Sequence, residues 1–413
     1  MAKKKWIAAG IDVGTTKICS CVAELEEDRI QVLGTGWASS KGLKKGVVVN
    51  LSETIKSLRH SLEKAEEAAN EAIESAFVSV GGRFIRSTNT SAQTEVRGRN
   101  GRVSTDDIGR AVSEAKNLEL PEEYQIIHVL TQGFRLDGQD GVSDPLGMSG
   151  HQLSVRLHLV LNATAVVQNI VNAINKAGVV VNGVVMQQLA SAEAVLTEDE
   201  KELGTALVDI GGGTTDISIY SHGSIWHSEV LPMGGSLITK DIAIGLRAPL
   251  QEAEQLKISV GGVFPDSVPA EEMVEIGEMG SGKMQSYPRR LLCQIAEARC
   301  EEILHATGQV FRRAGVRPDL TSGVVLTGGG SLMHGLVEKA QEILEMPARI
   351  GYPVNFESED PEIRHPAYST ALGLLKYAQG VRSNETARIA RSAVRARPKA
   401  TAERLKNWIF ERI

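Results

Sequence analysis

The sequence predicts an α/β protein in which two related domains face each other across a cleft. Two observations carry this prediction. The N-terminal segment 6–25 and the segment 205–230 share one pattern, a buried strand, a glycine-threonine turn and a returning strand. A third buried strand, at 321–328, ends in a glycine run that leads into a helical pattern. A strand-turn-strand unit that recurs in both halves of a chain is typical of an internally duplicated fold.

Length and composition exclude several classes of protein. At 413 residues, with 42% hydrophobic and 23% charged residues, the chain fits roughly two to four soluble domains. Four cysteines without a CxxC pair exclude a disulfide scaffold and a zinc ribbon, and we expect them in the core. No apolar run approaches the roughly 20 residues of a membrane span, and the N-terminal apolar stretch is too short for a secretion signal. The expected setting is the reducing cytoplasm.

Charge is distributed unevenly along the chain. Residues 381–413 contain nine basic and three acidic residues, a net charge of +6, which leaves −12 for residues 1–380. An acidic body gives no reason to expect nucleic-acid binding. A short basic tail indicates an anionic surface or an acidic partner.

Hydrophobic periodicity places the elements of the first half. Residues 52–69 carry apolar side chains at helical spacing, whereas AFVSVGG at 76–82 is a continuous apolar run that ends at glycine. The polar, turn-rich stretch 84–165 interrupts the repeat and is interpreted as an inserted subdomain. We predict strands at 6–13, 18–25, 30–38 and 76–82, and helices at 52–69, 105–118, 166–177 and 187–197.

The second half repeats this order. Three strands with two turns are predicted within 205–230, and the strand at 321–328 precedes a helix at about 333–345. Residues 246–311 form a second insertion, which we predict to be largely helical. After Gly380 the Arg/Ser/Ala-rich sequence indicates a mobile linker.

Both glycine-threonine turns are suited to binding phosphate. Glycine lets the backbone approach a phosphate closely, so that successive N–H groups point at its oxygens, and threonine adds hydroxyl donors. Asp12 and Asp209 stand at the ends of the strands before the turns, where each can hold a hydrated Mg²⁺. Neither turn is a Walker loop or a dinucleotide fingerprint, because GxxxxGK[ST] is absent and each turn leads into a strand. Two facing turns are expected to hold a nucleotide's phosphates from both sides.

Three motifs carry a resemblance to a known superfamily. IDVGTTK, VDIGGGTTD and LTGGGS resemble the first phosphate, second phosphate and adenosine motifs of the actin and heat-shock chaperone ATPases. The segment AEQLK at 253–257 resembles the AExxK helix that contacts ribose and adenine in bacterial members, and 189–193 and 366–373 resemble the two connecting helices. The resemblance implies an actin-like fold, with two ribonuclease H-like domains facing a nucleotide cleft, and ATP and Mg²⁺ as ligands.

The inserted region narrows the resemblance to one family. DPLGMSG at 144–150 and VRLHLV at 155–160 are similar to the NPxGLSG and VHLV segments of the FtsA family of bacterial cell-division proteins. LTEDEKELG at 196–204, the spacing of the five motifs and a C-terminal helix also resemble this family, so that the likeness covers nearly the whole chain. It implies that the first insertion serves self-assembly into filaments and recruitment of other division proteins. The second insertion would bind the tail peptide of the tubulin-like FtsZ, with Arg289 and Arg299 at or near that surface.

The resemblance also assigns the nucleotide site. Gln187 corresponds to the residue that orients the attacking water, with Gln188 as the alternative. Since glutamine positions water but is not a strong base, we expect at most slow ATP hydrolysis. Asp12 and Asp209 are the residues expected to hold the metal, through water. The nucleotide-binding residues are predicted to be Asp12, Gly14, Thr15, Thr16, Lys17, Asp209, Gly211, Gly212, Gly213, Thr214, Thr215, Gly234, Gly235, Glu254, Lys257, Gly328, Gly329, Gly330 and Ser331.

The C-terminal segment 399–413 has the profile of an interfacial helix. Its apolar side chains gather on one face at helical spacing, and basic side chains flank that face. Such a helix lies in the boundary of an anionic membrane and binds it reversibly, so that polymerisation adds avidity. The residues expected to contact the membrane are Leu405, Lys406, Trp408, Ile409, Phe410, Arg412 and Ile413.

Together these features predict an ATP-binding protein that polymerises and tethers FtsZ to the cytoplasmic face of the inner membrane, at the division septum. Two alternatives stay open, an ATP-binding adaptor of a pilus or secretion system and a small-molecule kinase of the same superfamily. The predicted boundaries are 1–83, 166–203 and the return helix 361–380 for the first domain, 204–245 and 312–360 for the second, 84–165 and 246–311 for the insertions, 381–398 for a basic linker and 399–413 for the terminal helix.

Overall fold

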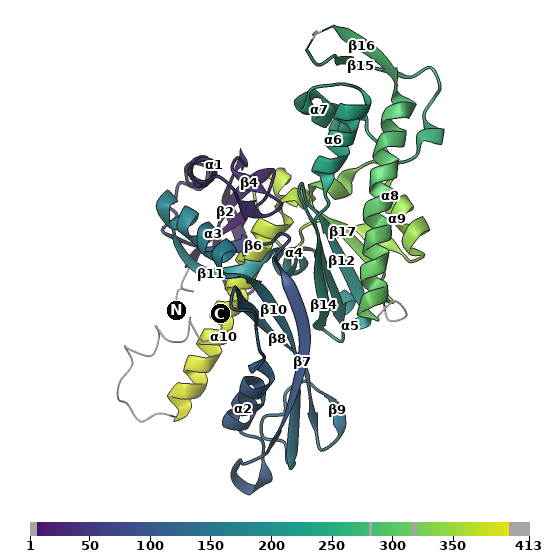
Figure 1. Cartoon of the computed structure of the whole chain (residues 1–413). Helices are drawn as coiled ribbons and strands as arrows, with labels where there is room; N and C mark the ends of the chain where they lie inside the picture. Colours follow the sequence, from purple (N-terminus) through teal and green to yellow (C-terminus); the bar gives the residue numbers. More distant parts are fainter. Residues whose placement is uncertain (1–5, 281–282, 316–319, 396–413) are drawn as a thin grey trace.

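The computed structural model describes residues 6–280, 283–315 and 320–395, with side chains up to Ser383. Its centre consists of two five-stranded sheets, one from each half of the chain. A four-stranded sheet and a two-stranded hairpin project from opposite ends of this centre (Figure 1). The first half is defined here as the sheet of β1 with its helices, and the second half as the sheet of β12 with its helices.

The first sheet has the strand order β11-β6-β1-β2-β3. β1, β2 and β3 are antiparallel neighbours, whereas β6 and β11 run parallel to β1. Apolar runs without polar interruption form β1 and β2, because helices cover both faces of this sheet. The strands are β1 (Trp6–Val13), β2 (Lys17–Leu25), β3 (Ile30–Ser39), β6 (Ser75–Val80) and β11 (Val180–Met186), with the short β4 (Leu43–Lys44) and β5 (Val47–Val48) after β3.

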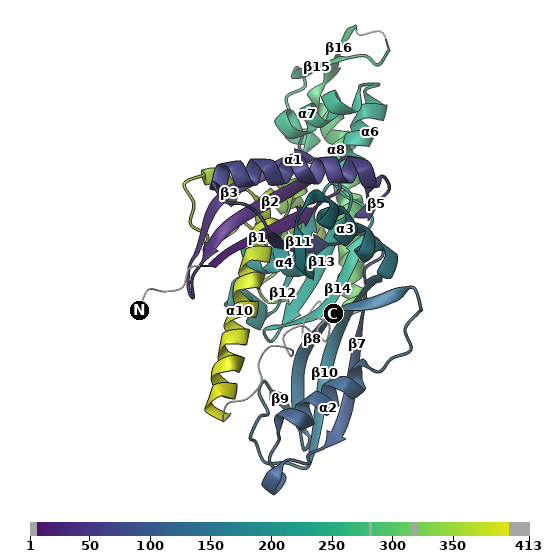
Figure 2. The ribbon, with the colours of Figure 1, turned by 90° about the vertical axis from the view of Figure 1, so that its left-hand side faces the viewer.

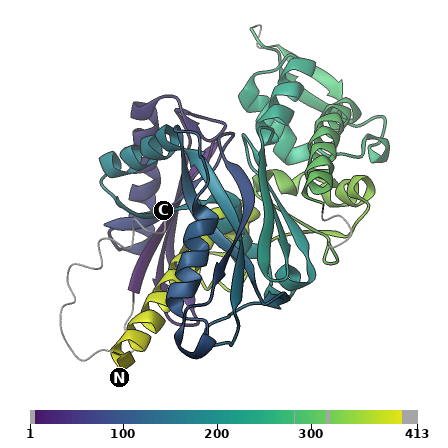
Figure 3. The same cartoon turned by 60° about the horizontal axis from the view of Figure 1, so that its bottom comes forward.

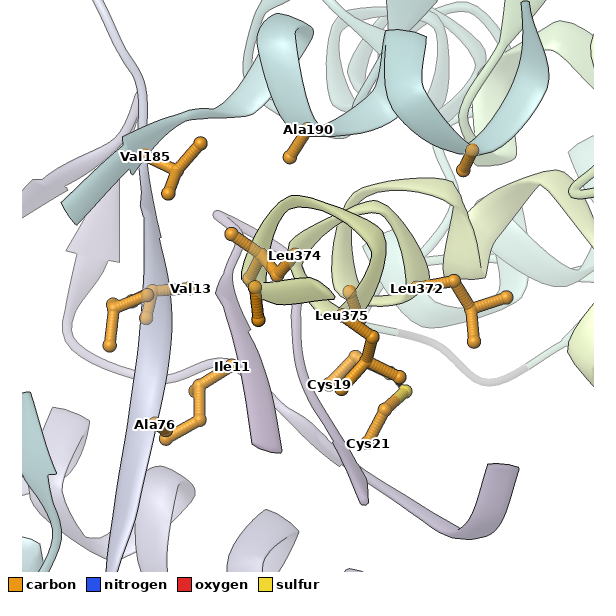
Figure 4. Close-up of a cluster of buried hydrophobic side chains, with 14 of the residues drawn as sticks. Ile11, Val13, Cys19, Cys21, Ala76, Val185, Ala190, Leu372, Leu374 and Leu375 are labelled. Atoms are coloured by element: carbon orange, nitrogen blue, oxygen red, sulfur yellow. Dashed lines mark hydrogen bonds between the residues drawn. The ribbon is translucent and has the colours of Figure 1, made fainter. Parts of the chain in front are cut away.

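Helices α1 (Leu51–Ala69) and α3 (Thr164–Ala177) cover one face of the first sheet, as Figure 2 shows for α1. Helices α4 (Gln187–Val195) and α10 (Ser369–Arg395) pack together near β1. Figure 4 shows Leu374 and Leu375 of α10 between Ala190 of α4 and the strands. Cys19 and Cys21 lie in the same core, so the prediction that these cysteines pack in the interior is confirmed.

The second sheet repeats the first, with the order β14-β13-β12-β17-β18. Again three antiparallel strands are followed by two parallel ones. This shared order is what the internal similarity of the sequence predicts. The elements are β12 (Thr205–Ile210), β13 (Thr215–Ser221), β14 (Ser224–Leu231), β17 (Val324–Thr327) and β18 (Ala348–Ile350), with α5 (Glu198–Leu203), α6 (Gly235–Gly245), α7 (Leu250–Val260), α8 (Arg289–Ala314) and α9 (Leu336–Leu344).

The first insertion is a sheet of order β7-β10-β8-β9 with one covering helix. Val155, Leu157 and Leu159 of β10 alternate with more polar neighbours and pack beneath that helix with Ala111. This arrangement lies within the predicted limits 84–165. Its elements are β7 (Arg86–Glu95), α2 (Thr105–Lys116), β8 (Tyr124–Leu136), β9 (Gln139–Val142) and β10 (Gln152–Ala163).

Two segments differ from their predicted form. The second insertion contains an antiparallel hairpin, β15 (Met273–Gly277) and β16 (Met284–Pro288), in addition to its helices. Helix α10 continues to Arg395, where the sequence analysis places a linker from residue 381. The sequence contains no glycine or proline between 381 and 397, and its alanines and arginines favour helix, so the helix propagates. The membrane residues predicted at 405–413 lie outside the described residues.

Candidate functional site

A cavity of about 560 Å³ lies where the two halves meet, a size that suits a small-molecule ligand. The turns β1–β2 and β12–β13 supply its floor, and Gly328, Gly329 and Gly330, after β17, supply a third side. Residues from α4, α6, α7, α8 and the turn before α10 also line it. The strand-turn-strand units of both halves therefore open into one space.

The two turns touch each other across this space. A Cβ atom built on Gly212 would stand 2.3 Å from Cγ2 and 2.4 Å from Oγ1 of Thr16, and one built on Gly213 would stand 2.6 Å from Oγ1 of Thr15. Real Cβ atoms do not approach other atoms so closely, so only glycine permits this contact. The backbone N–H groups and threonine hydroxyls of both turns are thus brought together at one place, as phosphate binding requires.

Three buried carboxylates surround the turns. Asp12 accepts hydrogen bonds from Ser79 Oγ at 2.8 Å and from Gln187 Nε2 at 3.1 Å. Asp209 accepts one from Ser191 Oγ at 2.5 Å. Because hydroxyl and amide donors are uncharged, they orient these two carboxylates but do not balance their negative charge.

Asp216 is the third carboxylate of the cavity. Its Oδ2 accepts a hydrogen bond from Thr214 at 2.7 Å, while its buried Oδ1 has no hydrogen-bond partner among the described residues. Asp209 is among the residues predicted from the sequence to bind the ligand, whereas Asp216 is not. The signal was present, since a GGGT turn between antiparallel strands places residue 216 opposite residue 209, the register that β12 and β13 have.

Burial changes the protonation of these groups. It raises the pKa of Asp209 to about 6, with a further contribution from Asp12, although the hydrogen bond from Ser191 opposes the change. It raises the pKa of Asp216 to about 8, and the nearby charge of Asp209 adds to this. Burial also raises the pKa of Asp12, against the opposing effects of Lys17 and Ser79. A cation beside these carboxylates would favour their charged forms, which burial disfavours.

A hydrated divalent cation fits this donor set. The observation that supports the fit is the unpartnered, buried oxygen of Asp216 beside two further carboxylates in one cavity. In the described ranges, no three His, Cys, Asp or Glu side chains converge closely enough to ligate a metal directly. The arrangement therefore suits a cation that reaches the carboxylates through water and the turns through a phosphate.

One lysine from each half lines the cavity. Lys17, at the start of β2, donates to the carbonyl oxygen of Ala367, and its Nζ lies 5.2 Å from the centroid of the Tyr368 ring. Lys257 of α7 donates to Glu254 at 2.7 Å and to Thr239 at 3.0 Å. Glu254 and Lys257 thus project into the cavity as a pair from successive turns of α7, as the AExxK motif predicts.

Most of the predicted nucleotide residues line this cavity, and three do not. Thr215 turns its hydroxyl to the carbonyl of Met233, and Ser331 turns its hydroxyl to the carbonyl of Gly328. Gly234 stands beside the lining residue Gly235, whose N–H donates to Gly211 at 2.9 Å. Lining residues that sequence analysis did not assign include Val13, Gly46, Asp216, Ser236, Ile258, Gly261, Met333, His334, His365, Pro366, Ala367 and Thr370.

The two glutamines at the start of α4 differ in environment. Gln187 lines the cavity and donates to Asp12, whereas Gln188 is fully buried and is absent from the lining. Neither the amide oxygen nor the amide nitrogen of Gln188 has a hydrogen-bond partner in the described structure. The geometry therefore favours Gln187 over Gln188 as a residue that meets a ligand.

The two arginines predicted for peptide binding are already engaged. Arg289, the first residue of α8, donates to Glu272 at 2.8 Å and to the carbonyl of Val260 at 2.8 Å, and it lines the cavity. Arg299, further along α8, donates to Asp241 at 2.6 Å and also pairs with Glu302. Of the two, Arg299 lies away from the cavity, on the face of α8 that meets α6.

Comparison with known proteins identifies the family. The family model "Cell division protein FtsA" matches residues 206–373, and the model "SHS2 domain inserted in FTSA" matches residues 82–161. The chain is 39% identical to the cell division protein FtsA of Pseudomonas aeruginosa over 97% of its own length and 96% of that protein's length. It is also 32% identical to FtsA of Escherichia coli, over 99% of this chain and 98% of that protein. The chain belongs to the FtsA family.

Solved structures agree with an actin-like fold at low sequence identity. The chain superposes on a structure titled "PilM-PilN type IV pilus biogenesis complex" with a TM-score of 0.62, at 15% identity, covering 90% of this chain and 98% of that one. Against MreB5 of Spiroplasma citri bound to ADP the TM-score is 0.55, at 13% identity, covering 92% and 98%. As an FtsA-family member the chain is an actin-like cell-division protein. Within the described residues, no helix has the length and apolarity to cross a membrane.

Proposed function

We propose that this FtsA-family chain binds ATP with Mg²⁺, polymerises, and tethers FtsZ filaments to the cytoplasmic face of the inner membrane at the septum, where it recruits later division proteins. The observation that carries the nucleotide part is the contact between the two glycine turns, Thr15 and Thr16 against Gly212 and Gly213, above three buried carboxylates. The actin-like MreB5, whose structure contains ADP, supports the same assignment.

In this proposal the turns bind the phosphates and α7 binds the nucleoside. Backbone N–H groups of both turns and the ammonium of Lys17 donate to phosphate oxygens. Asp12, Asp209 and Asp216 hold Mg²⁺ through water, and the bound cation neutralises phosphate charge. Glu254 and Lys257 face the ribose and the base. Gln187, held against Asp12, positions a water molecule without deprotonating it, which gives slow hydrolysis at most.

The affinity for Mg²⁺–ATP is expected to rise with pH. With pKa values of about 6 and 8, Asp209 and Asp216 carry protons that must leave before they can hold a cation. The stability of the ligand-free chain changes in the opposite sense. Because these folded-state pKa values exceed the unfolded value, their contribution to stability is lost as the pH rises through them.

Titration calorimetry across about pH 5.5–8.5 measures this dependence. The matched variant Asp216→Asn, which has no proton to lose, is expected to lack the upper part of the rise while keeping the part due to Asp209. An affinity with the same pH dependence in both proteins would contradict the assignment of Asp216 to the cation site. Comparing the two proteins cancels the titration of ATP itself.

The tethering part of the proposal rests on α8 and on the C-terminal residues. Arg299 is a partly exposed cation on α8 that an acidic peptide can reach by displacing Glu302, an exposed partner three residues away. Segment 399–413 supplies the amphipathic pattern and the flanking charges that an anionic membrane attracts. A polymer would present many copies of this segment to one membrane, so that weak individual contacts together give stable binding.

Co-sedimentation tests the two contacts separately. The full chain is expected to pellet with anionic phospholipid vesicles and to bring the FtsZ tail peptide with it. Deletion of residues 399–413 should abolish pelleting and keep peptide binding in solution. Arg299→Glu should weaken peptide binding about tenfold or more and leave vesicle binding unchanged, whereas the control Arg313→Glu, an exposed arginine at the end of the same helix, should change neither. Pelleting by the deletion variant would disprove the membrane contact.

A further inference from the structure

The first insertion belongs to the first half by chain connectivity, yet it also contacts the second half. Strands β7, β8 and β10 of the insertion pack against β14, the edge strand of the second sheet. Figures 2 and 3 show these strands side by side. This contact is separate from the cavity, and the helices α4 and α10 make a different connection between the halves.

Among the described residues, four side chains of the insertion hydrogen-bond to β14, and we call them the polar seam: Ser87 and Asn89 of β7, Gln132 of β8 and His158 of β10. Ser87 Oγ donates to the carbonyl of Ser228 at 2.7 Å, and Asn89 Nδ2 donates to the carbonyl of Trp226 at 3.0 Å. Gln132 Nε2 donates to the carbonyls of Ile225 at 3.0 Å and Trp226 at 3.1 Å. The seam therefore satisfies carbonyl groups that an edge strand otherwise leaves unpaired.

The buried imidazole of His158 fixes the geometry of the seam. Its Nδ1 lies 2.6 Å from Oδ1 of Asn89, an acceptor, so Nδ1 carries the proton. Its Nε2, 2.8 Å from Ser228 Oγ, accepts the hydrogen bond of that hydroxyl. Hydrogen bonds thus connect Ser228 to His158 and His158 to Asn89, which in turn bonds to the carbonyl of Trp226. Both ends of this series, Ser228 and Trp226, belong to β14.

Strand β8 is also linked to the cavity, through the residue that precedes α4. His128, four residues before Gln132, is buried, and its Nε2 accepts the backbone N–H of Met186 at 2.9 Å. Met186 immediately precedes Gln187, the residue that donates to Asp12. One strand thus holds both the edge of the second half and the start of α4 beside the cavity.

We propose that the polar seam holds the two halves in the closed arrangement in which the glycine turns meet. The halves can separate at the cavity only if β14 leaves the insertion or if the insertion moves with β14. The insertion is then a conformational sensor, whose position depends on whether the cavity is closed. Its coupling to ligand rests on the proposed nucleotide binding, whereas its contact with β14 does not.

Distance measurement between the insertion and the second half tests the seam without any ligand. All four native cysteines are buried, so spin labels can be placed at Ser143→Cys in the insertion and at Glu338→Cys on α9, both exposed. The parent is expected to give a narrow distance distribution by double electron–electron resonance. Asn89→Ala/Gln132→Ala should broaden it, and Ser228→Ala should broaden it less.

Gln93→Ala is the matched control, because Gln93 lies on β7 like Asn89, but its side chain hydrogen-bonds, among the described residues, only to Gln152 on β10. It should leave the distribution as in the parent. Hydrogen exchange in β1 and β12 shows whether a variant has kept its two central sheets. A distribution in the folded double variant that equals the parent's would overturn the seam.

A second measurement tests the coupling to the cavity. A fluorescent ATP analogue with Mg²⁺ should dissociate about 5- to 30-fold faster from Asn89→Ala/Gln132→Ala than from the parent, as expected for the loss of two hydrogen-bonding side chains. Equal dissociation rates would overturn the coupling. If the parent itself does not bind the analogue, the proposed nucleotide function fails, and the spin-label result still decides whether the seam holds the halves together.

Discussion

Replacing Gly373 with alanine is expected to lower the free energy of unfolding by about 3 kcal/mol or more. Gly373 lies on α10 where this helix crosses α4. A Cβ atom there would stand 1.7 Å from the carbonyl oxygen of Ala190 and 2.4 Å from its carbonyl carbon. Because the obstacle is backbone in the middle of another helix, no side-chain rotation relieves it. The two helices must separate, and the core between them must open.

The chain contains a matched control on the same helix. Gly380 is exposed, and a Cβ atom at that position would meet nothing within 4 Å. Gly380→Ala removes a poor helix former from a helix interior and is expected to stabilise the chain by up to about 1 kcal/mol. Urea unfolding followed by circular dichroism compares the two variants. Equal stability of the two would mean that the crossing of α4 and α10 tolerates separation.

The duplicated centre of the fold could be predicted because its signal is local. Strand, turn and strand follow one another within about 20 residues in each half, and the glycine turns mark where the strands reverse. The register of β12 and β13 follows from the turn length, so even the position of Asp216 was available from the sequence. The pairing of the turns across the cavity followed from the duplication.

The hydrogen bonds that hold the carboxylates could not be predicted in the same way. Ser79 reaches Asp12 across 67 residues of sequence and Ser191 reaches Asp209 across 18, and neither serine lies in a phosphate motif. The residues that bond across the polar seam lie still further apart in the sequence, since Asn89 and Trp226 are 137 residues apart. Such contacts depend on how whole sheets pack, and no periodicity in a single segment encodes them.

Composition is a poorer guide than helix propensity and periodicity in two segments. The Arg/Ser/Ala-rich composition after Gly380 predicts a linker, but alanine and arginine are good helix formers and no glycine or proline interrupts them up to residue 397, so the helix continues. Strand β15 carries an alternating pattern, with Val274 and Ile276 buried and Met273 and Glu275 exposed, and the sequence Gly-Ser-Gly follows at 280–282. That alternation was the signal for a strand within a region expected to be largely helical.

Replacing Gly212 with alanine is expected to weaken Mg²⁺–ATP binding about 100-fold or more, while the chain stays folded. The new methyl group would occupy the space of the Thr16 side chain, with distances of 2.3–2.9 Å to its three side-chain heavy atoms. Threonine is branched at Cβ and cannot rotate freely, so the two turns must move apart. Each turn then loses hydrogen bonds to phosphate, and two charge-assisted bonds of about 1.5–3 kcal/mol each account for the loss.

Two companion variants make this result specific to the contact between the turns. Thr16→Ser removes Cγ2, the atom nearest the new methyl group, and keeps the hydroxyl, so Gly212→Ala/Thr16→Ser should recover part of the affinity. Gly109→Ala, on an exposed turn of α2 where a Cβ atom meets nothing within 4 Å, should bind as the parent does. Calorimetric titration measures all four proteins. If Gly212→Ala binds as tightly as the parent, the turns do not hold the phosphates jointly, and the ligand of this cavity is not gripped from both halves.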